Sequence, residues 1–195
     1  MSADETPQLR FKTKAAWAKW LAKHHTDEAG IWVEMAKAGA GEKSISHADA
    51  LEVALCYGWI DGQAKSIDEH FWRQKFVPRR KQSLWSKINQ EKALALIESG
   101  LMQPAGLAAI EQAKANGRWA AAYVGPKLST VPPDLQAELD QRPKAAAFFA
   151  SLDSQNRYAI LFRLQTARKA ETRAARLRKF VEMLERGERL HEKTP

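Results

Sequence analysis

Between Leu164 and Leu184, apolar residues recur every three or four positions, and this spacing constrains the fold more than any other feature of the chain. One side of a helix returns every 3.6 residues, so such a seam predicts a helix that buries one side. We expect one long final helix, capped by Asp153 or Ser154. The seam consists of Leu164, Ala167, Ala170, Ala174, Leu177, Val181 and Leu184.

Two N-terminal segments carry signals for the start of a helix. Thr13 is placed to cap a helix over residues 14–25, and Ser46 with Asp49 forms an S-x-x-D capping box for a helix over residues 47–57. Prolines, which suit the first turn of a helix, open three of the later helical segments. The later segments are 86–99, 104–116, 133–141 and 143–152.

A few short segments have strand character. The sequence IWVEMA over residues 31–36 is rich in β-branched and aromatic residues. Residues 63–67 and 71–77 flank a polar turn and predict a β-hairpin, whose second strand ends at Pro78. Residues 1–12 are expected to form a polar arm.

These elements predict an α+β fold that is mostly helical, because many helices accompany few strands and no βαβ alternation is present. We expect an N-terminal α+β domain over residues 1–124, with a small hairpin or short sheet, and an all-helical C-terminal region over residues 125–195. Three prolines and a glycine within a short stretch place the linker at about residues 125–133.

The chain carries a formal net charge of +8, which favours association with phosphates, nucleic acid or other anionic surfaces. The apolar fraction of 45% is high enough for a real core. No stretch approaches the ~20 apolar residues that a membrane span needs. The N-terminus lacks the apolar segment of a signal peptide, so we expect a cytoplasmic protein.

Motifs for metal binding and nucleophilic catalysis are missing from the sequence. The single cysteine, Cys56, excludes an intrachain disulfide and a Cys-based zinc site, and its apolar surroundings predict a buried thiol. The five histidines show no H-x-x-x-H spacing, and no G-x-S-x-G elbow is present. We therefore expect no metal and no cofactor.

The stretch KFVPRRKQSLWSKIN, residues 75–89, combines several groups that favour anion binding. Paired arginines can donate parallel hydrogen bonds to a carboxylate or phosphate, and a helix start near the end of the stretch would add free N–H groups. A solvated turn with capping serines and a core tryptophan is the alternative. The candidate ligand-binding residues are Trp59, Asp61, Arg79, Arg80, Ser83, Trp85, Ser86 and Asn89.

Asp61 lies in the apolar sequence GWIDG, where an ionised carboxylate needs a partner. Asp61 and Gly62 together form a dipeptide typical of turns. Arg79 or Arg80 would be the natural partner of Asp61 if the hairpin folds back. A catalytic role as acid or base is the alternative and would require a second group, which the sequence does not identify.

The C-terminal segment from Arg163 to Lys179 has many basic residues and one acidic residue, Glu171. On an amphipathic helix these would form a basic face able to contact a polyanion, although no recognised nucleic-acid-binding motif accompanies them. A solvated face is the alternative. The candidate contact residues are Arg168, Lys169, Arg173, Arg176 and Lys179.

Four ordered blocks of the sequence resemble the YdeI/OmpD-associated family, which is also called the bacteriocin-protection family. They are ALCYGWIDGQ, KFVPRRKQSLWSKIN, ESGLMQPAGLAAIE and TARKAETRAARLRKFVEML, within about residues 12–190. Arg168 stands where the family has a lysine, which keeps the charge but changes the donor geometry. The motif positions are Gly58, Trp59, Ile60, Asp61, Gly62, Pro78, Arg79, Arg80, Ser83, Trp85, Ser86, Asn89, Ala167, Arg168, Thr172, Arg173 and Arg176.

The resemblance implies a bacterial protein associated with stress or bacteriocin resistance, and it implies no defined reaction. Three functions follow as hypotheses. The first is binding of a small anionic ligand at the arginine-rich stretch, and the second is association with nucleic acid through the basic C-terminal helix. The third is an enzyme that uses Asp61 as acid or base.

Overall fold

The computed structural model describes residues 6–192 and has the α+β, mostly helical fold that the sequence predicts. The chain divides into two compact units. The N-terminal unit contains the residues up to Trp85 together with Asn89–Ala120. The C-terminal unit contains Ser86–Ile88 together with the residues from Ala121 onward.

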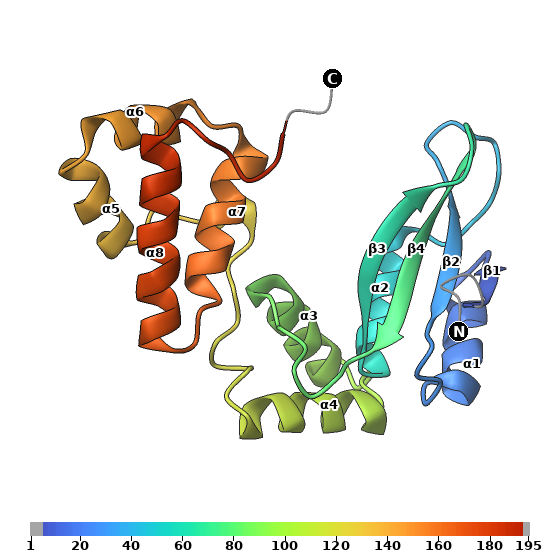
Figure 1. Ribbon diagram of the computed structural model, residues 1–195. Helices are drawn as coiled ribbons and strands as arrows, with labels where there is room; N and C mark the ends of the chain where they lie inside the picture. Colours follow the sequence, from blue (N-terminus) through green and yellow to red (C-terminus); the bar gives the residue numbers. More distant parts are fainter. Residues whose placement is uncertain (1–5, 193–195) are drawn as a thin grey trace. The chain divides into compact units, whose positions relative to one another are not determined.

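The N-terminal unit is built on a four-stranded sheet with the order β1-β2-β4-β3 (Figure 1). β1 runs parallel to β2, and the other two pairings are antiparallel. The expected strand over 31–36 and the expected hairpin are confirmed, and Pro78 ends the hairpin's second strand as predicted. The strands are β1 (Gln8–Arg10), β2 (Ile31–Ala36), β3 (Trp59–Ser66) and β4 (Phe71–Pro78).

Two sequence predictions about this sheet are wrong. The expected polar arm contains β1, because the edge of β2 offers Gln8–Arg10 a row of backbone partners; residues 1–5 of the arm lie outside the described residues. Asp61 and Gly62 lie inside β3 and do not form a turn. The pairing of β3 with β4 shifts between Asp61 and Ala64, and the Gln74 side chain donates to the Gly62 carbonyl at 2.9 Å.

Helices α1 (Lys14–His24) and α2 (His47–Cys56) cover one face of the sheet (Figure 1). Both caps are as predicted, since the Thr13 hydroxyl accepts from the Ala16 N–H and the Ser46 hydroxyl accepts from the Asp49 N–H. The core between the helices and the sheet includes the fully buried residues Trp17, Leu21, Ile31, Val33, Leu55, Trp59 and Phe76.

Helices α3 (Lys87–Glu98) and α4 (Pro104–Ala115) follow the sheet. Pro104 opens α4 as predicted, and Gly100 ends the α3 segment with a φ of 70° that only glycine adopts readily. α4 packs closely against the end of α2, where Gly106 faces the carbonyl of Cys56. A side chain at position 106 would hold the two helices apart.

The C-terminal unit is helical, with a core of Leu135, Phe149, Ile160, Leu164, Phe180, Leu184 and neighbouring residues. The prediction of one long final helix is wrong, because the chain turns back between α7 and α8 (Figure 1). The reversal lets Leu164 and Leu184 enter one core, whereas a single helix would leave its apolar seam uncovered. The elements are η1 (Pro126–Leu128), α5 (Pro133–Asp140), α6 (Pro143–Ser151), α7 (Ser154–Gln165) and α8 (Ala170–Glu185).

Among residues 6–192, the helices are too short or too polar to cross a membrane.

Candidate functional site

The turn after β4 holds the first of the two predicted arginines against the protein. The Arg79 guanidinium lies 3.6 Å from the centre of the Trp85 ring, and its Nη1 donates to the Leu84 carbonyl at 3.0 Å. The backbone N–H of Arg79 donates to the Gly58 carbonyl at 2.9 Å. Arg79 therefore helps to fix the turn, because stacking and hydrogen bonding hold its planar group in one place.

Arg80 and Ser83 form a tight turn at the surface. The Ser83 hydroxyl accepts from the Arg80 N–H at 2.9 Å, and the Ser83 N–H donates to the Arg80 carbonyl at 2.8 Å. The side chain of Arg80 is exposed. Of the two arginines, Arg80 is the one that a ligand in solution can reach.

The two predicted tryptophans belong to the core. Trp59 is fully buried, and its indole N–H donates to the His25 carbonyl at 2.7 Å. Trp85 is 2% exposed and packs edge-on against Trp119, with ring centres 4.8 Å apart. Both rings are enclosed in the core, and their part in a ligand site stays a prediction.

The start of α3 also differs from the predicted anion site. The N–H of Lys87 donates to the Tyr123 carbonyl at 2.9 Å, so this helix end has fewer free donors than expected. Ser86 belongs to the C-terminal unit, and its backbone bridges to Tyr123. Asn89 is buried, at 8% exposure.

Asp61 has a histidine as its partner, where the sequence suggested an arginine. Its carboxylate lies 3.1 Å from Nε2 of His47, the first residue of α2. The register explains the difference, because Asp61 lies opposite Phe76 on the face that α2 covers. Arg79 follows the end of β4 and pairs its backbone with Gly58.

A hollow of about 300 Å³ lies beside His47. The rings of His47 and Trp72, which both line it, are 6.1 Å apart. Both serine hydroxyls in the lining already accept backbone N–H groups. His47 and Asp61 could move a proton, and the enzyme hypothesis stays a prediction. The lining residues are Met35, Ala36, Lys37, Ala38, Glu42, Ser44, Ile45, Ser46, His47 and Trp72.

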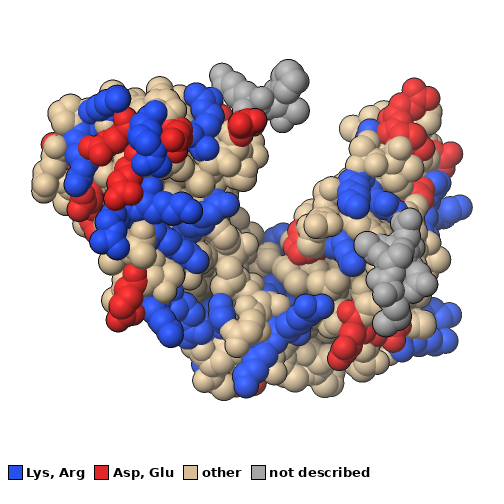
Figure 2. Space-filling view, viewed as in Figure 1, with Lys and Arg blue, Asp and Glu red and all other residues tan. Residues whose placement is uncertain are grey.

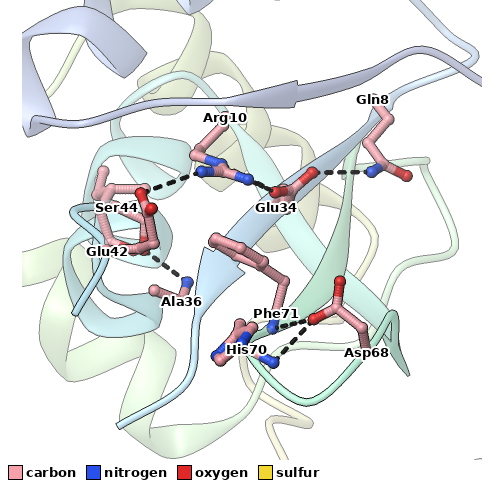
Figure 3. Close-up of polar contacts among 10 residues, drawn as sticks. Gln8, Arg10, Glu34, Ala36, Glu42, Ser44, Asp68, His70 and Phe71 are labelled. Carbon is pink, nitrogen blue, oxygen red and sulfur yellow. Dashed lines mark hydrogen bonds and ion pairs between the residues drawn. The ribbon is translucent and has the colours of Figure 1, made fainter. Parts of the chain in front are cut away.

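The face of the sheet opposite the helices carries a neutralised arginine (Figure 3). The Arg10 guanidinium lies 3.8 Å from the centre of the Phe71 ring. It forms ion pairs with Glu34 and, at 3.5 Å, with Glu42. Arg10 is thus fully compensated on this face.

The hairpin loop beside this face is fixed by Asp68 (Figure 3). Its carboxylate accepts the backbone N–H groups of His70 and Phe71, both at 2.8 Å. These bonds lower the pKa of the Asp68 carboxyl below its ordinary value, because they stabilise the ionised form. Asp68 therefore has a structural part in the turn of this loop.

In the C-terminal unit, Arg173 is used inside the fold. Its Nε and Nη2 donate to the two oxygens of Asp134 at 2.7 and 2.8 Å, and its Nη1 donates to the Leu164 carbonyl at 2.7 Å. The hydrogen bonds from Arg173 lower the pKa of the Asp134 carboxyl. Arg173 therefore joins α8 to α5, and each of its three nitrogens already donates a hydrogen bond inside the fold.

The other predicted basic residues lie on α8 or directly before it. Figure 2 shows many Lys and Arg side chains at the surface of the protein. Arg168, Lys169 and Lys179 are exposed, and Arg176 is half-buried with its Nη1 donating to the Arg163 carbonyl at 2.6 Å. A shallow hollow of about 440 Å³ lies beside them. It is lined by Glu171, Thr172, Ala175, Arg176 and Lys179.

Comparisons with known proteins match two separate parts of the chain to two different families. Residues 9–109, just over half of the chain, match a family described as a domain of unknown function, DUF8412. The chain belongs to this family. Residues 129–187 match a second family, described as bacteriocin-protection, YdeI or OmpD-associated. No curated protein and no solved structure matches the chain.

The predicted resemblance to the YdeI/OmpD-associated family is confirmed for residues 129–187. It was expected over about residues 12–190, but the N-terminal blocks fall in the DUF8412 region. The basic start of α8 lies in the bacteriocin-protection region, whereas Asp61, Arg79 and Arg80 lie in the DUF8412 region.

The sequence did not identify His47 as a partner of Asp61. Its position directly after the Ser46 cap was visible, but its neighbour across the fold depends on the strand register. Among the described residues of this DUF8412 family member, no group of three or more His, Cys, Asp or Glu side chains is placed to hold a metal ion.

Proposed function

We propose that the protein is a cytosolic binding protein for polyanions, and that basic residues of α8 contact the phosphate backbone of nucleic acid. One observation carries the proposal. Four basic side chains gather on one short segment, and none of them has a carboxylate partner among residues 6–192. They are Lys169, Arg176, Arg178 and Lys179.

The surface around these residues suits a phosphate backbone. Ala174 and Ala175 are exposed on the same helix, and their small side chains let a polymer approach closely. Thr172 adds a hydroxyl beside the hollow. From Lys169 to Lys179 the helix rises ~15 Å, a length over which a nucleic acid presents several phosphates.

A membrane surface fits this helix less well than nucleic acid. An interfacial helix needs large apolar side chains next to its basic face. In α8 the large apolar residues face the core, as Phe180, Val181, Met183 and Leu184 are all buried. The exposed side offers charge and small residues, which favours contact with phosphates.

The small-ligand hypothesis for the stretch around Arg79 receives less support, because Arg79 stacks on Trp85 and Asp61 bonds to His47. A part in bacteriocin protection, which the description of the matched family names, belongs to the same proposal. If the protein acts by contacting nucleic acid, its effect on bacteriocin protection would be indirect.

Fluorescence anisotropy with a labelled DNA duplex at several salt concentrations tests the proposal. We expect the affinity to fall steeply as salt rises, with a slope of about −0.9 for each phosphate contact. The double variant R176Q/K179Q should bind more weakly and with a slope reduced by about 2.

The matched control is K19Q/K23Q, which removes two charges from the exposed side of α1. It should retain the slope of the wild type. If both double variants lose the same affinity for DNA, the binding depends only on the net charge of the protein. Absence of binding at low salt would overturn the proposal outright.

A further inference from the structure

The face of the sheet opposite α1 and α2 carries a second group of basic side chains. Strand alternation puts Trp32 of β2 and Lys75 of β4 on this face, directly opposite each other. Arg73 lies two residues before Lys75 on the same face, opposite Lys65 of β3. We call these four residues the Trp32 cluster.

All three cations of the Trp32 cluster lie over the indole. The Arg73 guanidinium carbon is 4.6 Å from the centre of the Trp32 ring, and the Lys65 and Lys75 ammonium nitrogens are 5.4 and 5.8 Å from it. The ring itself is only 5% exposed. The indole therefore fixes where the three charges stand, since cations are attracted to the face of an aromatic ring.

The positive charge of the cluster is not neutralised by the described residues. Arg73 donates to the Gln8 side-chain oxygen at 2.8 Å, and the Lys75 ammonium lies 3.3 Å from the Thr6 hydroxyl. Both partners are uncharged. Nε of Arg73 is buried and has no hydrogen-bond partner among residues 6–192.

Among residues 6–192, the acidic residue opposite Arg73 in the strand register already has partners. Glu34 lies opposite Arg73 in the register, but its carboxylate binds Arg10 and accepts from Gln8 at 3.0 Å. Arg10 shows the contrast on the same face, because it also covers an aromatic ring but has two carboxylate partners (Figure 3).

Without a bound anion, the Trp32 cluster destabilises the folded protein. Lys65 and Arg73 are directly opposite across two strands, where like charges repel. A half-buried guanidinium with an unused donor adds a further cost. Both costs are removed when an anion with two or more charges enters the cluster.

We propose that the Trp32 cluster is a binding site for a phosphate group. Arg73 supplies a planar donor to the phosphate oxygens, and Lys65 and Lys75 supply point charges beside it. The covered indole is unavailable for stacking with a base, so recognition is limited to the phosphate. The site belongs to the N-terminal unit, whereas α8 belongs to the C-terminal unit, and the proposal does not depend on contact with nucleic acid.

NMR spectroscopy of the full chain tests the site directly. Inorganic pyrophosphate, titrated at constant ionic strength, should shift the indole N–H signal of Trp32 and the Nε–H signal of Arg73 in a saturable way. K65Q and K75Q should each weaken the apparent affinity about tenfold, the loss expected for one charge-assisted hydrogen bond. K19Q removes the same charge from α1 and should leave the affinity unchanged.

A stability measurement guards against misfolding of the variants. Without an anion, K65Q should melt at the same temperature as the wild type or higher, because a repulsive contact has been removed. With pyrophosphate, the wild type should gain more in melting temperature than K65Q. Equal gains in the wild type, K65Q and K19Q would overturn the site, as would unsaturable shifts at Trp32.

Two further arms identify the source of the phosphate. Glycerol 3-phosphate represents small phosphate esters, and a short single-stranded DNA represents polymer phosphates. A shift at Trp32 with either probe supports the site and names its source, whereas a shift with neither overturns it. R176Q/K179Q should leave the Trp32 response to pyrophosphate intact, so failure of the α8 proposal and failure of this one are distinguishable.

Discussion

Arg173 of α8 holds the carboxylate of Asp134 in α5 through two hydrogen bonds, from Nε at 2.7 Å and from Nη2 at 2.8 Å. The bonds lower the pKa of Asp134 in the folded state below its ordinary value near 3.8. The pair therefore stabilises the fold above that ordinary value, and its contribution is lost as pH falls through the lowered pKa.

Replacing Asp134 with asparagine should destabilise the protein at pH 7 by about 1 kcal/mol, since the pair is partly exposed to solvent. The difference between D134N and the wild type should be smaller at pH 2 than at pH 7, because the wild-type carboxyl takes up a proton as pH falls through its lowered pKa. Urea unfolding at both pH values measures it. D140N, an exposed carboxylate without an ion pair among residues 6–192, is the control, and a D134N difference that is equal at both pH values would contradict the role of the pair.

Arg79 and Arg80 are neighbours in the sequence but should respond differently to mutation. Arg79→Ala removes the stack on Trp85 and the bond to the Leu84 carbonyl, and should cost about 2 kcal/mol of stability. Arg80→Ala removes an exposed side chain and should change stability by less than about 0.5 kcal/mol. Urea unfolding of both variants measures the difference, and similar values for the two would refute a structural role for Arg79.

The starts of helices could be predicted because their causes are local. The Thr13, Ser46 and Asp153 side chains each accept an N–H within three residues, and Pro104 needs only its own ring geometry. The break between α7 and α8 could not be predicted in this way. It depends on Leu164 and Leu184 meeting in one core, which the apolar spacing alone does not encode.

The candidate sites depended on strand pairing, which the sequence does not reveal. Asp61 and Lys65 are four residues apart and would share a face in a regular strand. The shift between Asp61 and Ala64 sends Asp61 toward α2 and Lys65 to the opposite face, beside Trp32. The partners of Asp61 and Lys65 therefore could not be predicted without knowledge of the strand register.

Gly106 should resist substitution because α4 approaches α2 closely at this point. A methyl group there would collide with the carbonyl oxygen of Cys56 and with the Met102 sulfur. Alanine favours a helix over glycine by about 1 kcal/mol, but overpacking costs about 1–3 kcal/mol, so we expect net destabilisation. Gly62→Ala is the control, since its nearest neighbour would be 3.7 Å away. Thermal unfolding compares them, and a G106A protein as stable as G62A would contradict the close packing.

Cys56 should react slowly with thiol reagents in the native protein. The thiol is 7% exposed, and burial raises its pKa above the ordinary value, so little thiolate is present at pH 8. We expect modification by a chromogenic disulfide reagent to be slow in buffer and fast in urea, where the thiol regains its ordinary pKa. A small peptide thiol in the same two solutions serves as the control for the effect of urea on the reagent. Rapid reaction of the native protein would show that Cys56 is accessible and would contradict the burial of the thiol.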